Sequence, residues 1–595
     1  PLSPENPIVL GAGPLIGAPV PGAAKVAGTT KFALPAAEDG RCYVASGASG
    51  SQRFGVMLKR AGYDHLVITG RASKPVYIRI LDDDVGIIDA DRLWGTKDAY
   101  ETVDELKHDL GDCGVLSIGA AGENQVKFAL ALTDKKSTLG RNGFGAVMGS
   151  KNLKAVCVRG TKPVKLKDRE RLRTALAPLL ESLKENPMMP LFHEMGIHAG
   201  WEYWKHLLNP GVWPKDKWDE LYGMDKCREA VERTHGCTGC VIKCKPVQRV
   251  SDGEWKGVQT ETSHFLHVAG MGQTLGIEDW RPMVKLLEVC NRAGSCAVSS
   301  VGLLAMATVC FEMGALTEEQ TGGVKLARGD FPGYLSMLEK IIKREDLGDA
   351  LAEGWFEAAK HLDLDPHAFL GLIKGAPCIY DARNTHMDPR IFHMIVNPRG
   401  AHHPQCHWTT SIPMQPLERI RSDFMMTGAG QKETERIFGT EDFNCARLTR
   451  HIQDVGMAYD CLGTCVIYPL AGAPLNVNAL AEFYSATTGL ETSPAELKTS
   501  GERAFNLLKL LNVREGFSRK DDMSPQLWFQ PKSTPDGDEE LKDYYGRKRL
   551  DEKDMEGMLD DYYGERGWDL KSGTPTRDKL DELGLAEYVK DESAH

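Results

Sequence analysis

Three cysteines lie close together in one short loop, His235-Gly-Cys237-Thr-Gly-Cys240-Val-Ile-Lys-Cys244. Their Cys-x2-Cys-x3-Cys spacing brings three thiolates onto one glycine-assisted turn. Three corners of a [4Fe-4S] cluster can be held this way, with a fourth cysteine arriving from elsewhere in the fold. Structural zinc is the alternative, but zinc sites usually draw their ligands from two separated pairs, and no second pair follows nearby. The spacing therefore favours an electron-transferring cluster over zinc.

Four glycine-dense loops precede these cysteines, at residues 11–17, 46–51, 118–124 and 139–151. Glycine lets consecutive backbone N–H groups approach an anion closely, and Arg141, Lys151 and Lys154 would add positive charge beside the last loop. None of the loops is a Walker A sequence or a Gly-x-Gly-x-x-Gly turn, and each one alone is better explained as a tight turn between strands. Together with the cysteine motif, they favour a redox cofactor that carries phosphate.

The elements that must position these groups change in character along the chain, which predicts an α+β fold. Residues 1–165 are rich in glycine and in short β-type runs, and they predict a β-rich domain. Leucine-rich stretches with helical spacing dominate residues 166–375 and, after an opening rich in proline and histidine, residues 376–595. These two parts predict mainly helical domains. The expected helices include 169–184, 280–293, 334–343, 350–361, 475–488 and 502–511.

Composition narrows the class of protein. The 595 residues include 72 basic and 83 acidic side chains, and the net charge of −11 argues against a nucleic-acid partner. No apolar run has the length that a membrane span needs. The 15 cysteines are odd in number and mostly lie singly in apolar segments, which predicts a reducing, cytoplasmic setting. Because the chain starts at Pro1 without a methionine, we expect an N-terminal part to be missing.

The motifs also follow a recognisable order along nearly the whole chain. The most specific parts are the segment 140–155 and the pairing of the cysteine loop with Asp460-Cys-Leu-Gly-Thr-Cys465. The other matching segments are 13–17, 58–64, 119–124, 567–569 and 575–576. In this order they resemble the tungsten-pterin aldehyde:ferredoxin oxidoreductase family. The resemblance implies a β-rich pterin-cradling domain followed by two mainly helical domains, in agreement with the boundaries given above.

The resemblance implies a second metal centre and completes the first. Cys465 matches the fourth cluster ligand, beside Cys237, Cys240 and Cys244. The implied cofactor is tungsten, less often molybdenum, held by two molybdopterin dithiolenes whose phosphates are bridged by Mg²⁺. The metal itself is left largely untouched by the protein in this family, so the sequence leaves tungsten and molybdenum open.

Three further residues match the family's pterin contacts. Arg141 matches the residue that contacts one pterin and its phosphate. Lys25 stands where the family usually has arginine, and it would face the other pterin. Asp460 matches the aspartate that hydrogen-bonds a pterin ring.

Candidate catalytic groups come from two segments. Gln259-Thr-Glu261-Thr resembles the family's Glu-Tyr-Glu-Thr, so Glu261 matches its active-site glutamate. Pro398-Arg-Gly400-Ala-His402-His403 resembles the family's Arg-Gly-x-x-His, which implies an active-site histidine at His403 or, with a shift of one residue, at His402. A carboxylate and an imidazole beside a metal centre are the groups needed to move protons. On the residues alone, an ordinary helix-terminal acid and two loop histidines explain the same pattern equally well.

The sequence departs from the family pattern in two places. Asn291-Arg-Ala-Gly-Ser-Cys296 stands where the family repeats its aspartate motif as Asp-x-x-Gly-Leu-Asp, so we expect the second pterin to be contacted differently or by a neighbouring residue. Gly50-Ser-Gln-Arg53-Phe replaces a glycine-pair loop, and we expect Arg53 to lie close to the cofactor. A separate aromatic stretch at 198–206 places His198 and Glu202 four residues apart. They could form a metal pair, but packing of an aromatic-rich segment is the preferred interpretation.

Three functions fit these observations. The leading hypothesis is an oxidoreductase that interconverts aldehydes and carboxylic acids and exchanges electrons with ferredoxin or a ferredoxin-like subunit, most simply as an oligomer. The alternative is the catalytic subunit of a tungsten-dependent benzoyl-CoA (aryl-CoA) reductase-like complex, which would take an acyl-CoA substrate. The third is a zinc-stabilised scaffold, for which the glycine loops would be mere turns. Tungsten with about four irons would separate the two enzymes from the scaffold.

Overall fold

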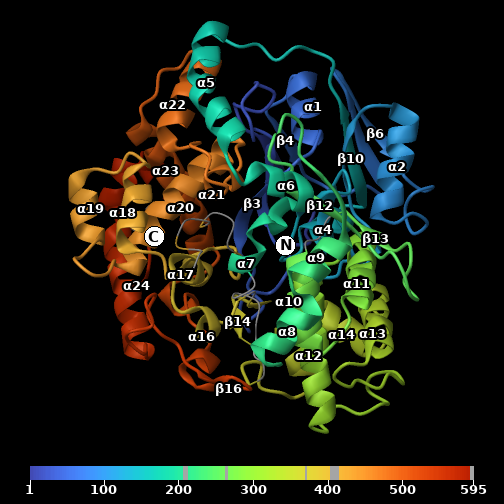
Figure 1. Ribbon diagram of the computed structural model, residues 1–595. Coiled ribbons are helices and arrows are strands. Elements are labelled where there is room, and N and C mark those ends of the chain that lie inside the picture. Colours follow the sequence, from blue (N-terminus) through green and yellow to red (C-terminus); the bar gives the residue numbers. More distant parts are fainter. Residues whose placement is uncertain are drawn as a thin grey trace, which may run out of the picture.

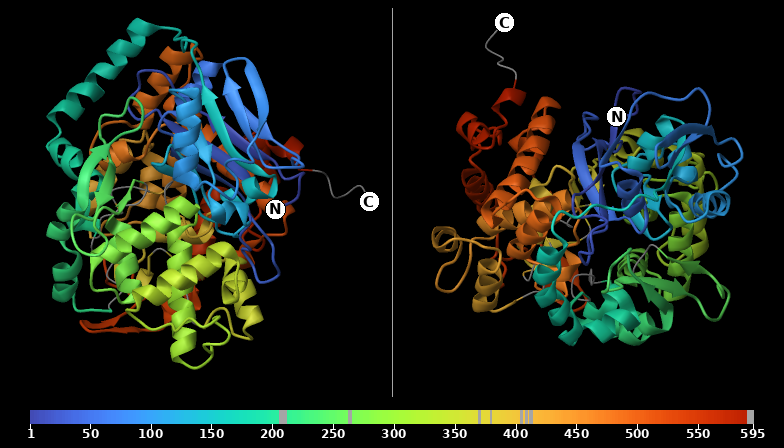
Figure 2. Two further views of the ribbon diagram at one scale, coloured as in Figure 1. Left: turned by 90° about the vertical axis from the view of Figure 1, so that its right-hand side faces the viewer. Right: turned by 90° about the horizontal axis from the view of Figure 1, so that it is seen from above.

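The computed structural model describes residues 1–204, 212–261, 265–368, 371–378, 380–402, 406, 410 and 414–589. Strands dominate the first third of the chain, and helices of the middle third (green) and of the last third (orange to red) flank it (Figure 1, Figure 2). The predicted α+β class, with a β-rich start followed by mainly helical parts, is confirmed. Among the described residues, no helix has both the length and the apolar character needed to cross a membrane.

Two sheets form the β-rich part. One is antiparallel with strand order β3-β2-β1-β4, and the other has order β6-β5-β10-β7-β8-β9, in which β10 and β5 pair in parallel. β10 is covered on both sides, which explains why its sequence is a nearly continuous apolar run. The strands are β1 (Ile8–Ala12), β2 (Lys25–Lys31), β3 (Val44–Gly50), β4 (His65–Ile68), β5 (Val76–Leu81), β6 (Asp84–Asp89), β7 (Gly114–Ser117), β8 (Ala131–Thr133), β9 (Ser137–Leu139) and β10 (Leu153–Arg159). Between them lie α1 (Phe54–Ala61), α2 (Ala99–Leu110), α3 (Ala120–Glu123) and α4 (Phe144–Ser150).

The middle part of the chain, residues 169–361, is mainly helical, with one small sheet that carries the cysteine loop. The helices are α5 (Arg169–Glu185), α6 (Met189–Met195), α7 (Trp201–Trp204), α8 (Lys215–Tyr222), α9 (Met224–Ala230), α10 (Phe265–Leu275), α11 (Trp280–Ala293), α12 (Ala297–Glu312), α13 (Phe331–Lys343), α14 (Leu347–Ala352) and α15 (Trp355–His361). The strands are β11 (Val231–His235), β12 (Lys245–Arg249) and β13 (Gln259–Thr260), in that order and antiparallel. The helix expected at 350–361 is in fact two helices, because Gly354 has a φ of +94° and separates α14 from α15.

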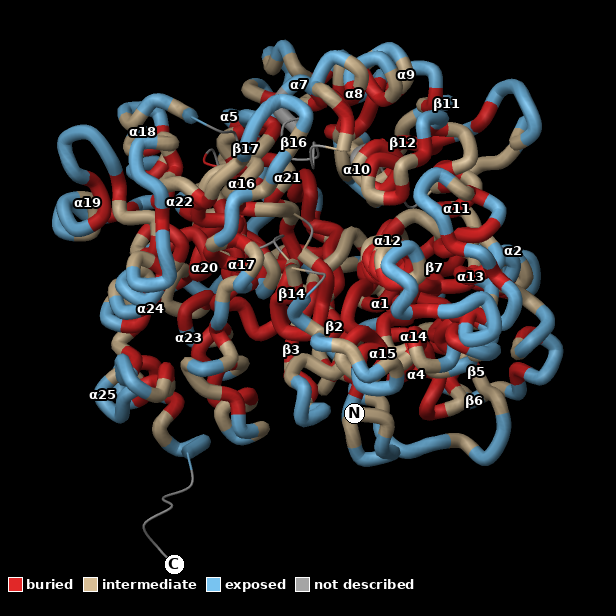
Figure 3. Tube along the Cα trace, turned by 90° about the horizontal axis from the view of Figure 1, so that it is seen from below, coloured by how far each residue is buried: buried red, intermediate tan, exposed pale blue. Residues whose placement is uncertain are grey.

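The last third holds the long helices α20 and α23. Its helices are α16 (Ala382–Thr385), α17 (Pro389–Val396), α18 (Leu417–Met425), α19 (Gln431–Ile437), α20 (Cys445–Leu462), α21 (Ile467–Leu470), α22 (Val477–Thr488), α23 (Pro494–Arg514), α24 (Glu552–Arg566) and α25 (Arg577–Glu582). Two-stranded ribbons are formed by β14 (Leu372–Ile373) with β15 (Ala376–Pro377) and by β16 (Lys532–Thr534) with β17 (Gly537–Glu539). The path of the chain through β2, α17 and α20 is buried, whereas α18, α19 and α25 lie at the exposed rim (Figure 3).

The β-rich part shares a hydrophobic core with each helical region. One cluster joins residues of α4 and β10 to α11, α12 and α13, and a second joins the loop before β2 to α5, α20 and α22. The sequence of α5 explains how this helix joins the second cluster. Asp168 caps the first turn of α5 by accepting a hydrogen bond from Arg171 N–H, and the buried leucines of the helix recur with helical spacing, so they line one face. These leucines belong to the second cluster. Helices α5, α20 and α22 therefore pack together against the loop before β2.

Two close contacts fix the junction between β1–β3 and the last third. A Cβ on Gly13 would lie 2.2 Å from the backbone carbon of Leu462, so only glycine permits this approach of the first loop to the end of α20. Asn512 of α23 acts like a further strand beside β3, because its side chain accepts from Val44 N–H at 2.8 Å and donates to Val44 C=O at 2.7 Å. In both contacts the backbone of the β-rich part is itself one of the two partners.

Candidate active site

The cysteine loop closes a hairpin between β11 and β12, where His235 pairs with Lys245. The loop turns tightly, with Cys240 N–H donating to Cys237 C=O at 3.0 Å. It rests on the end of β3: Thr238 Oγ1 donates to Gln52 C=O at 2.9 Å, and Gln52 Nε2 donates to Cys237 Sγ at 3.4 Å. The hairpin therefore holds three partly exposed thiols against the β-rich part.

The fourth thiol arrives from α20. The helix ends at Gly463, whose φ of +76° suits glycine and turns the chain so that Cys465 follows directly. Burial raises the pKa of Cys465 to about 11, the Lys25 ammonium opposes that rise, and the charges of Cys240 and Cys237 add to it. Tyr468 O–H also reaches Cys240 Sγ at 3.5 Å. The structure thus brings together the four cysteines Cys237, Cys240, Cys244 and Cys465.

The four cysteines lie close enough to affect one another's pKa, but their sulfur atoms are not grouped tightly enough to bind one metal ion. Within the described parts of the chain, no three His, Cys, Asp or Glu side chains lie close enough to hold a metal ion. Burial raises the pKa of Cys244 and of Cys237, and the Lys245 ammonium opposes both shifts. The positive charges of Lys25 and Lys245 therefore offset part of the effect of burial on these thiols.

An ion pair joins the sheet to α20 beside these thiols. Lys25 Nζ lies 2.7 Å from Asp460 Oδ1, and both side chains are more than nine-tenths buried. Burial is the largest influence on the pKa of Lys25 and lowers it, but the charges of Asp460 and Cys465 together raise the pKa above its ordinary value. Lys25 N–H also donates to Gly463 C=O at 2.9 Å. Lys25 and Asp460, two of the predicted pterin contacts, thus pair with each other, and Asp460 lies in the last turn of α20, just before Cys465.

Two buried arginines lie nearby with incomplete pairing. Arg141 Nη2 donates to Pro377 C=O at 2.6 Å, while among the described residues its Nε and Nη1 have no hydrogen-bond partner. Arg399 donates to Gly140 C=O, and its Nε is likewise left without a described partner. Burial and the charge of Arg141 lower the pKa of Arg399 to about 10, so both guanidinium groups are charged at neutral pH. Unsatisfied buried N–H groups on cations indicate a place where an anion binds.

The segment that replaces the family's aspartate motif reaches the same place. Burial lowers the pKa of Arg141, and the Cys296 thiol beside it opposes that shift. Asn291 Nδ2 donates to Thr260 Oγ1 at 2.6 Å, next to Glu261. Of this segment, Cys296 therefore lies beside Arg141, and Asn291 lies beside the residue that precedes Glu261.

Glu261 follows β13, and β13 pairs with β12 directly after the cysteine loop. Its side chain is 18 % exposed, and Oε2 lies 3.6 Å from Lys136 Nζ. Its backbone N–H donates to Tyr100 O–H at 3.4 Å. The structure thus positions Glu261 at a strand end, not in a helix, in the small sheet that carries the three cysteines.

The candidate histidines fall at the edge of the described chain. His402 is half-buried, and its C=O accepts a hydrogen bond from Asn397 Nδ2 at 3.1 Å. His403 lies outside the described residues. Arg53 ion-pairs with Asp112 and is 41 % exposed, whereas its neighbour Gln52 contacts Cys237. Its expected closeness to a cofactor stays a prediction.

Residues 205 and 206 of the aromatic stretch lie outside the described residues, and His198 and Trp201 are packed, as preferred. His198 is fully buried between Trp201 and Phe265, and its Nε2 accepts from Phe265 N–H at 2.8 Å. Burial lowers the pKa of His198 to about 3. Glu202, by contrast, is exposed.

Two residues of the site escaped the sequence analysis as site residues. Arg399 appears there only as the first residue of a histidine motif, and Cys296 only as part of a departure from the family. The available signal was weak in both cases: an arginine between proline and glycine, and a cysteine where an aspartate is usual.

A β-rich domain whose cations and thiols meet a helical region in this way defines a class of metal-cofactor oxidoreductase. Its sequence matches the family description "Aldehyde ferredoxin oxidoreductase, N-terminal domain" over residues 1–160 and "domains 2 & 3" over residues 177–585. The chain therefore belongs to the aldehyde ferredoxin oxidoreductase family, as the motifs predicted. Membership implies a tungsten–pterin cofactor.

Individual relatives agree with this assignment. The tungsten-containing aldehyde ferredoxin oxidoreductases of Pyrococcus furiosus and Pyrococcus abyssi are 29 % and 30 % identical over 99 % of this chain and 91 % and 92 % of their own. A WOR-like subunit of an aliphatic sulfonate oxidoreductase from Pyrococcus furiosus is 27 % identical over 91 % of this chain and 83 % of its own. The solved complex BamBC of benzoyl coenzyme A reductase with 1,5-dienoyl-CoA shares the fold, with a TM-score of 0.79, 24 % identity and coverage of 98 % and 90 % of the two chains.

Proposed function

We propose that this protein is a tungsten-bispterin, [4Fe-4S] oxidoreductase that interconverts aldehydes and carboxylic acids and exchanges electrons with a ferredoxin-type carrier. The observation that carries the proposal is the meeting of four thiols with buried, incompletely paired cations at one junction. Thiolates suit an iron–sulfur cluster, and guanidinium groups suit the phosphates and dithiolene charges of pterin cofactors. The relatives named for tungsten and aldehyde support the same reading.

The chain's own residues fit the cofactors that the family implies. Arg141 and Arg399 would hold pterin phosphates through the N–H groups that lack described partners, with Mg²⁺ between the phosphates. The Lys25–Asp460 pair would present one ammonium and one carboxylate to the second pterin. Cys237, Cys240, Cys244 and Cys465 would hold the cluster. When bound, the tungsten–pterin group supplies two-electron chemistry and the cluster supplies one-electron transfer.

Glu261 would handle protons beside this centre. Oxidation of an aldehyde to the carboxylic acid takes an oxygen atom from water and releases two electrons and two protons, so the site needs a base as well as an electron path. The Glu261 side chain is only partly exposed, and Lys136 Nζ, 3.6 Å from Oε2, would help to orient the carboxylate. His402 or His403 would orient the substrate carbonyl or pass on the proton.

The cysteine loop offers an exit for electrons. Val241 is 40 % exposed, and Thr238 and Lys243 of the same loop also face solvent. A small acidic electron carrier of the ferredoxin type could therefore approach the cluster at this loop. The 15 cysteines are all free, which fits a reducing, cytoplasmic compartment.

Anaerobic purification with elemental analysis, followed by a viologen-linked assay with a panel of aldehydes, tests the proposal. Tungsten, about four irons and aldehyde-dependent dye reduction are the expected result. Zinc without tungsten or iron would overturn it. The same metals without aldehyde turnover would shift the function to reduction of an aryl-CoA with partner subunits.

A further inference from the structure

The hairpin formed by β14 and β15 lies close to both turns that carry the buried guanidinium groups. Its register pairs Ile373 with Ala376. Lys374 and Gly375 therefore form the two-residue turn between the strands, and their φ values of +52° and +72° are typical of a type I′ turn. A Cβ on Gly375 would lie 1.9 Å from Pro35 C=O, so the tip of the hairpin is packed directly against the β-rich part.

Lys374 connects the tip of this hairpin to the turn that carries Arg399. Lys374 Nζ donates to Asn397 C=O at 2.8 Å, and Gly400 N–H donates to the same oxygen at 2.9 Å. A carbonyl oxygen has two lone pairs, so it can accept both bonds. Asn397 caps the C-terminal end of α17, where a cation also interacts favourably with the helix dipole. The lysine therefore bonds the carbonyl group at which the turn closes.

A buried carboxylate holds the ammonium group of Lys374 in place. Lys374 Nζ lies 2.7 Å from Asp522 Oδ1, and each of the two side chains is 2 % exposed. Asp522 Oδ2 accepts from Tyr563 O–H at 2.6 Å and from Lys509 Nζ at 3.3 Å. Each of these contacts joins a donor to an acceptor. Asp522 is therefore fixed by residues of α24 and α23, and it fixes Lys374.

The turn after Asn397 determines the direction of Arg399. Arg399 N–H donates to Asn397 Oδ1 at 3.1 Å, and Arg399 C=O accepts from Asn142 Nδ2 at 2.7 Å. With its backbone held on both sides, Arg399 directs its guanidinium group to Gly140 C=O, in the loop that carries Arg141. The direction of the Arg399 side chain therefore depends on the shape of this turn.

The hairpin also contacts the other guanidinium group, because Pro377 C=O at the end of β15 accepts from Arg141 Nη2 at 2.6 Å. We propose that Lys374, anchored by Asp522, is a positioning residue that holds the turn at 397–400 and thereby directs Arg399 into the active site. The consequence for cofactor binding rests on the proposed function, whereas the placement of the turn does not. A lysine side chain is flexible, so it can hold a turn only when its ammonium group is itself fixed.

Amide hydrogen exchange of the purified holoenzyme tests the placement of the turn. Lys374→Met keeps an unbranched side chain of similar length and removes the donor. Exchange in the segment 397–402 should become about tenfold faster, as expected when one buried hydrogen bond is lost. The same variant should retain less pterin and tungsten than the wild type. Unchanged exchange in this segment would overturn the proposal.

Lys509→Met is the matched control, because the two lysines share the Asp522 carboxylate. Lys509 is also buried, but its Nζ lies 4.9 Å from the centre of the Trp568 ring, and within the described chain it makes no hydrogen bond to the turn. Each substitution leaves Asp522 with one lysine, so both should lower the melting temperature. Only Lys374→Met should speed exchange at 397–402. Equal acceleration in both variants would mean general loosening and would overturn the proposal.

Asp522→Asn tests the anchor, and it keeps the proposal testable if Lys374→Met is too unstable to purify. Asparagine retains an oxygen for Lys374 but loses the charge that strengthens the bond. Exchange at 397–402 should therefore rise by about threefold, between the wild type and Lys374→Met. Exchange at the wild-type rate would contradict the anchoring role of Asp522.

The proposed reaction and the placement of the turn can fail separately. If the turn responds as expected and the wild-type enzyme shows no aldehyde turnover, the proposed reaction is wrong and the positioning role of Lys374 stands. If the wild-type enzyme oxidises aldehydes and the turn does not respond, the reaction stands and the positioning role is wrong.

Discussion

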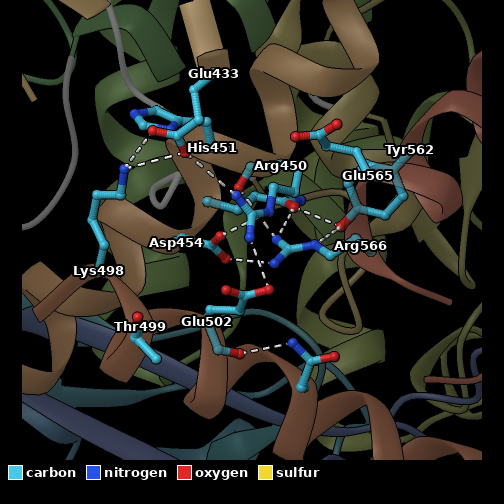
Figure 4. Close-up of polar contacts among 12 residues, drawn as sticks. Glu433, Arg450, His451, Asp454, Lys498, Thr499, Glu502, Tyr562, Glu565 and Arg566 are labelled. Carbon is cyan, nitrogen blue, oxygen red and sulfur yellow. Dashed lines mark hydrogen bonds and ion pairs between the residues drawn. The ribbon is translucent and has the colours of Figure 1, made fainter. Parts of the chain in front are cut away.

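Two groups of buried charged side chains, one at the junction around Arg141 and one between α20, α23 and α24, differ in how their charges are paired. In the second group, Arg566 pairs with Asp454, and Arg450 lies 2.8 Å from Glu502 (Figure 4). At the junction, Lys25 has Asp460, but Arg141 and Arg399 keep N–H groups without described partners. Buried charges that are paired within the chain need no further partner, whereas unpaired N–H groups on buried cations offer a place for an anionic ligand.

The largest effect should follow from removing a thiol at the junction. Cys465→Ser is expected to lose or degrade the cluster and leave much of the fold intact, since serine is a poor ligand for iron. Iron and acid-labile sulfide analysis, with electron paramagnetic resonance of the reduced protein, measures the loss. Cys461→Ser is the control, because Cys461 is a neighbouring free cysteine outside the motif positions. A full iron complement in Cys465→Ser would remove Cys465 from the ligand set.

Glu261→Gln should spare both metals and remove most aldehyde turnover, by about 10²–10⁴-fold, because the amide cannot accept a proton. Viologen-linked kinetics with metal analysis on the same sample measures this. Unchanged kinetics would remove Glu261 from the mechanism and leave the junction with binding groups only.

A pair of arginine substitutions tests the comparison itself. Arg566→Met should lower the free energy of unfolding by about 1–3 kcal/mol, because Asp454 loses its closer partner and keeps only Arg450, whose Nε lies 3.1 Å away. Arg141→Met should raise the stability of the cofactor-free protein by about 1–4 kcal/mol, because an unbalanced buried charge is removed. The same variant should lose pterin and tungsten. Calorimetry measures the stability of each variant, and metal analysis measures its tungsten content. If both variants were destabilised, the two groups of charges would not differ in the way described.

The smallest effect is a difference in pH dependence. Burial lowers the pKa of His451, beside the paired group, to about 4 from an ordinary value of 6.5. The unfolded chain therefore binds a proton that the folded chain does not, and stability falls as the pH drops from 6.5 through 4. Lys25 has a raised pKa, so its contribution is present below the ordinary lysine pKa and is lost as the pH rises through the folded value.

His451→Gln should flatten the acid limb of melting temperature against pH and leave the alkaline limb unchanged. Thermal melts from pH 4 to pH 11 measure both limbs. An acid limb that keeps its slope in this variant would assign the acid sensitivity to another group.

The sequence alone predicts groups that lie close together along the chain better than it predicts which distant residues they meet. Cysteine spacing predicts a cluster loop because those ligands are neighbours along the chain, and leucine periodicity predicts α5 and α11 within a residue or two. Spacing could not single out Cys465 among the remaining cysteines, and the family resemblance was needed to name it. The reason is physical: α20 delivers that thiol from far along the chain.

The missed parts depend on tertiary contacts. Lys25 and Asp460 are 435 residues apart, and nothing in either segment predicts that they meet. Arg399 sits between a proline and a glycine, a context that usually marks an exposed turn, and only the fold shows that it is buried. The break at Gly354 was also missed, because a single glycine within a helical pattern is often tolerated.

The pairing of Asn512 with Val44 bears on how the chain can be divided. β3 lies at an edge of its sheet, and the Asn512 carboxamide occupies both backbone hydrogen-bonding groups of Val44. A fragment limited to residues 1–160, the span of the N-terminal family match, would leave that end of the edge strand open. Open strand edges pair with other chains and aggregate. The β-rich part is therefore expected to be insoluble when expressed alone and to recover when the segment containing α23 is supplied beside it.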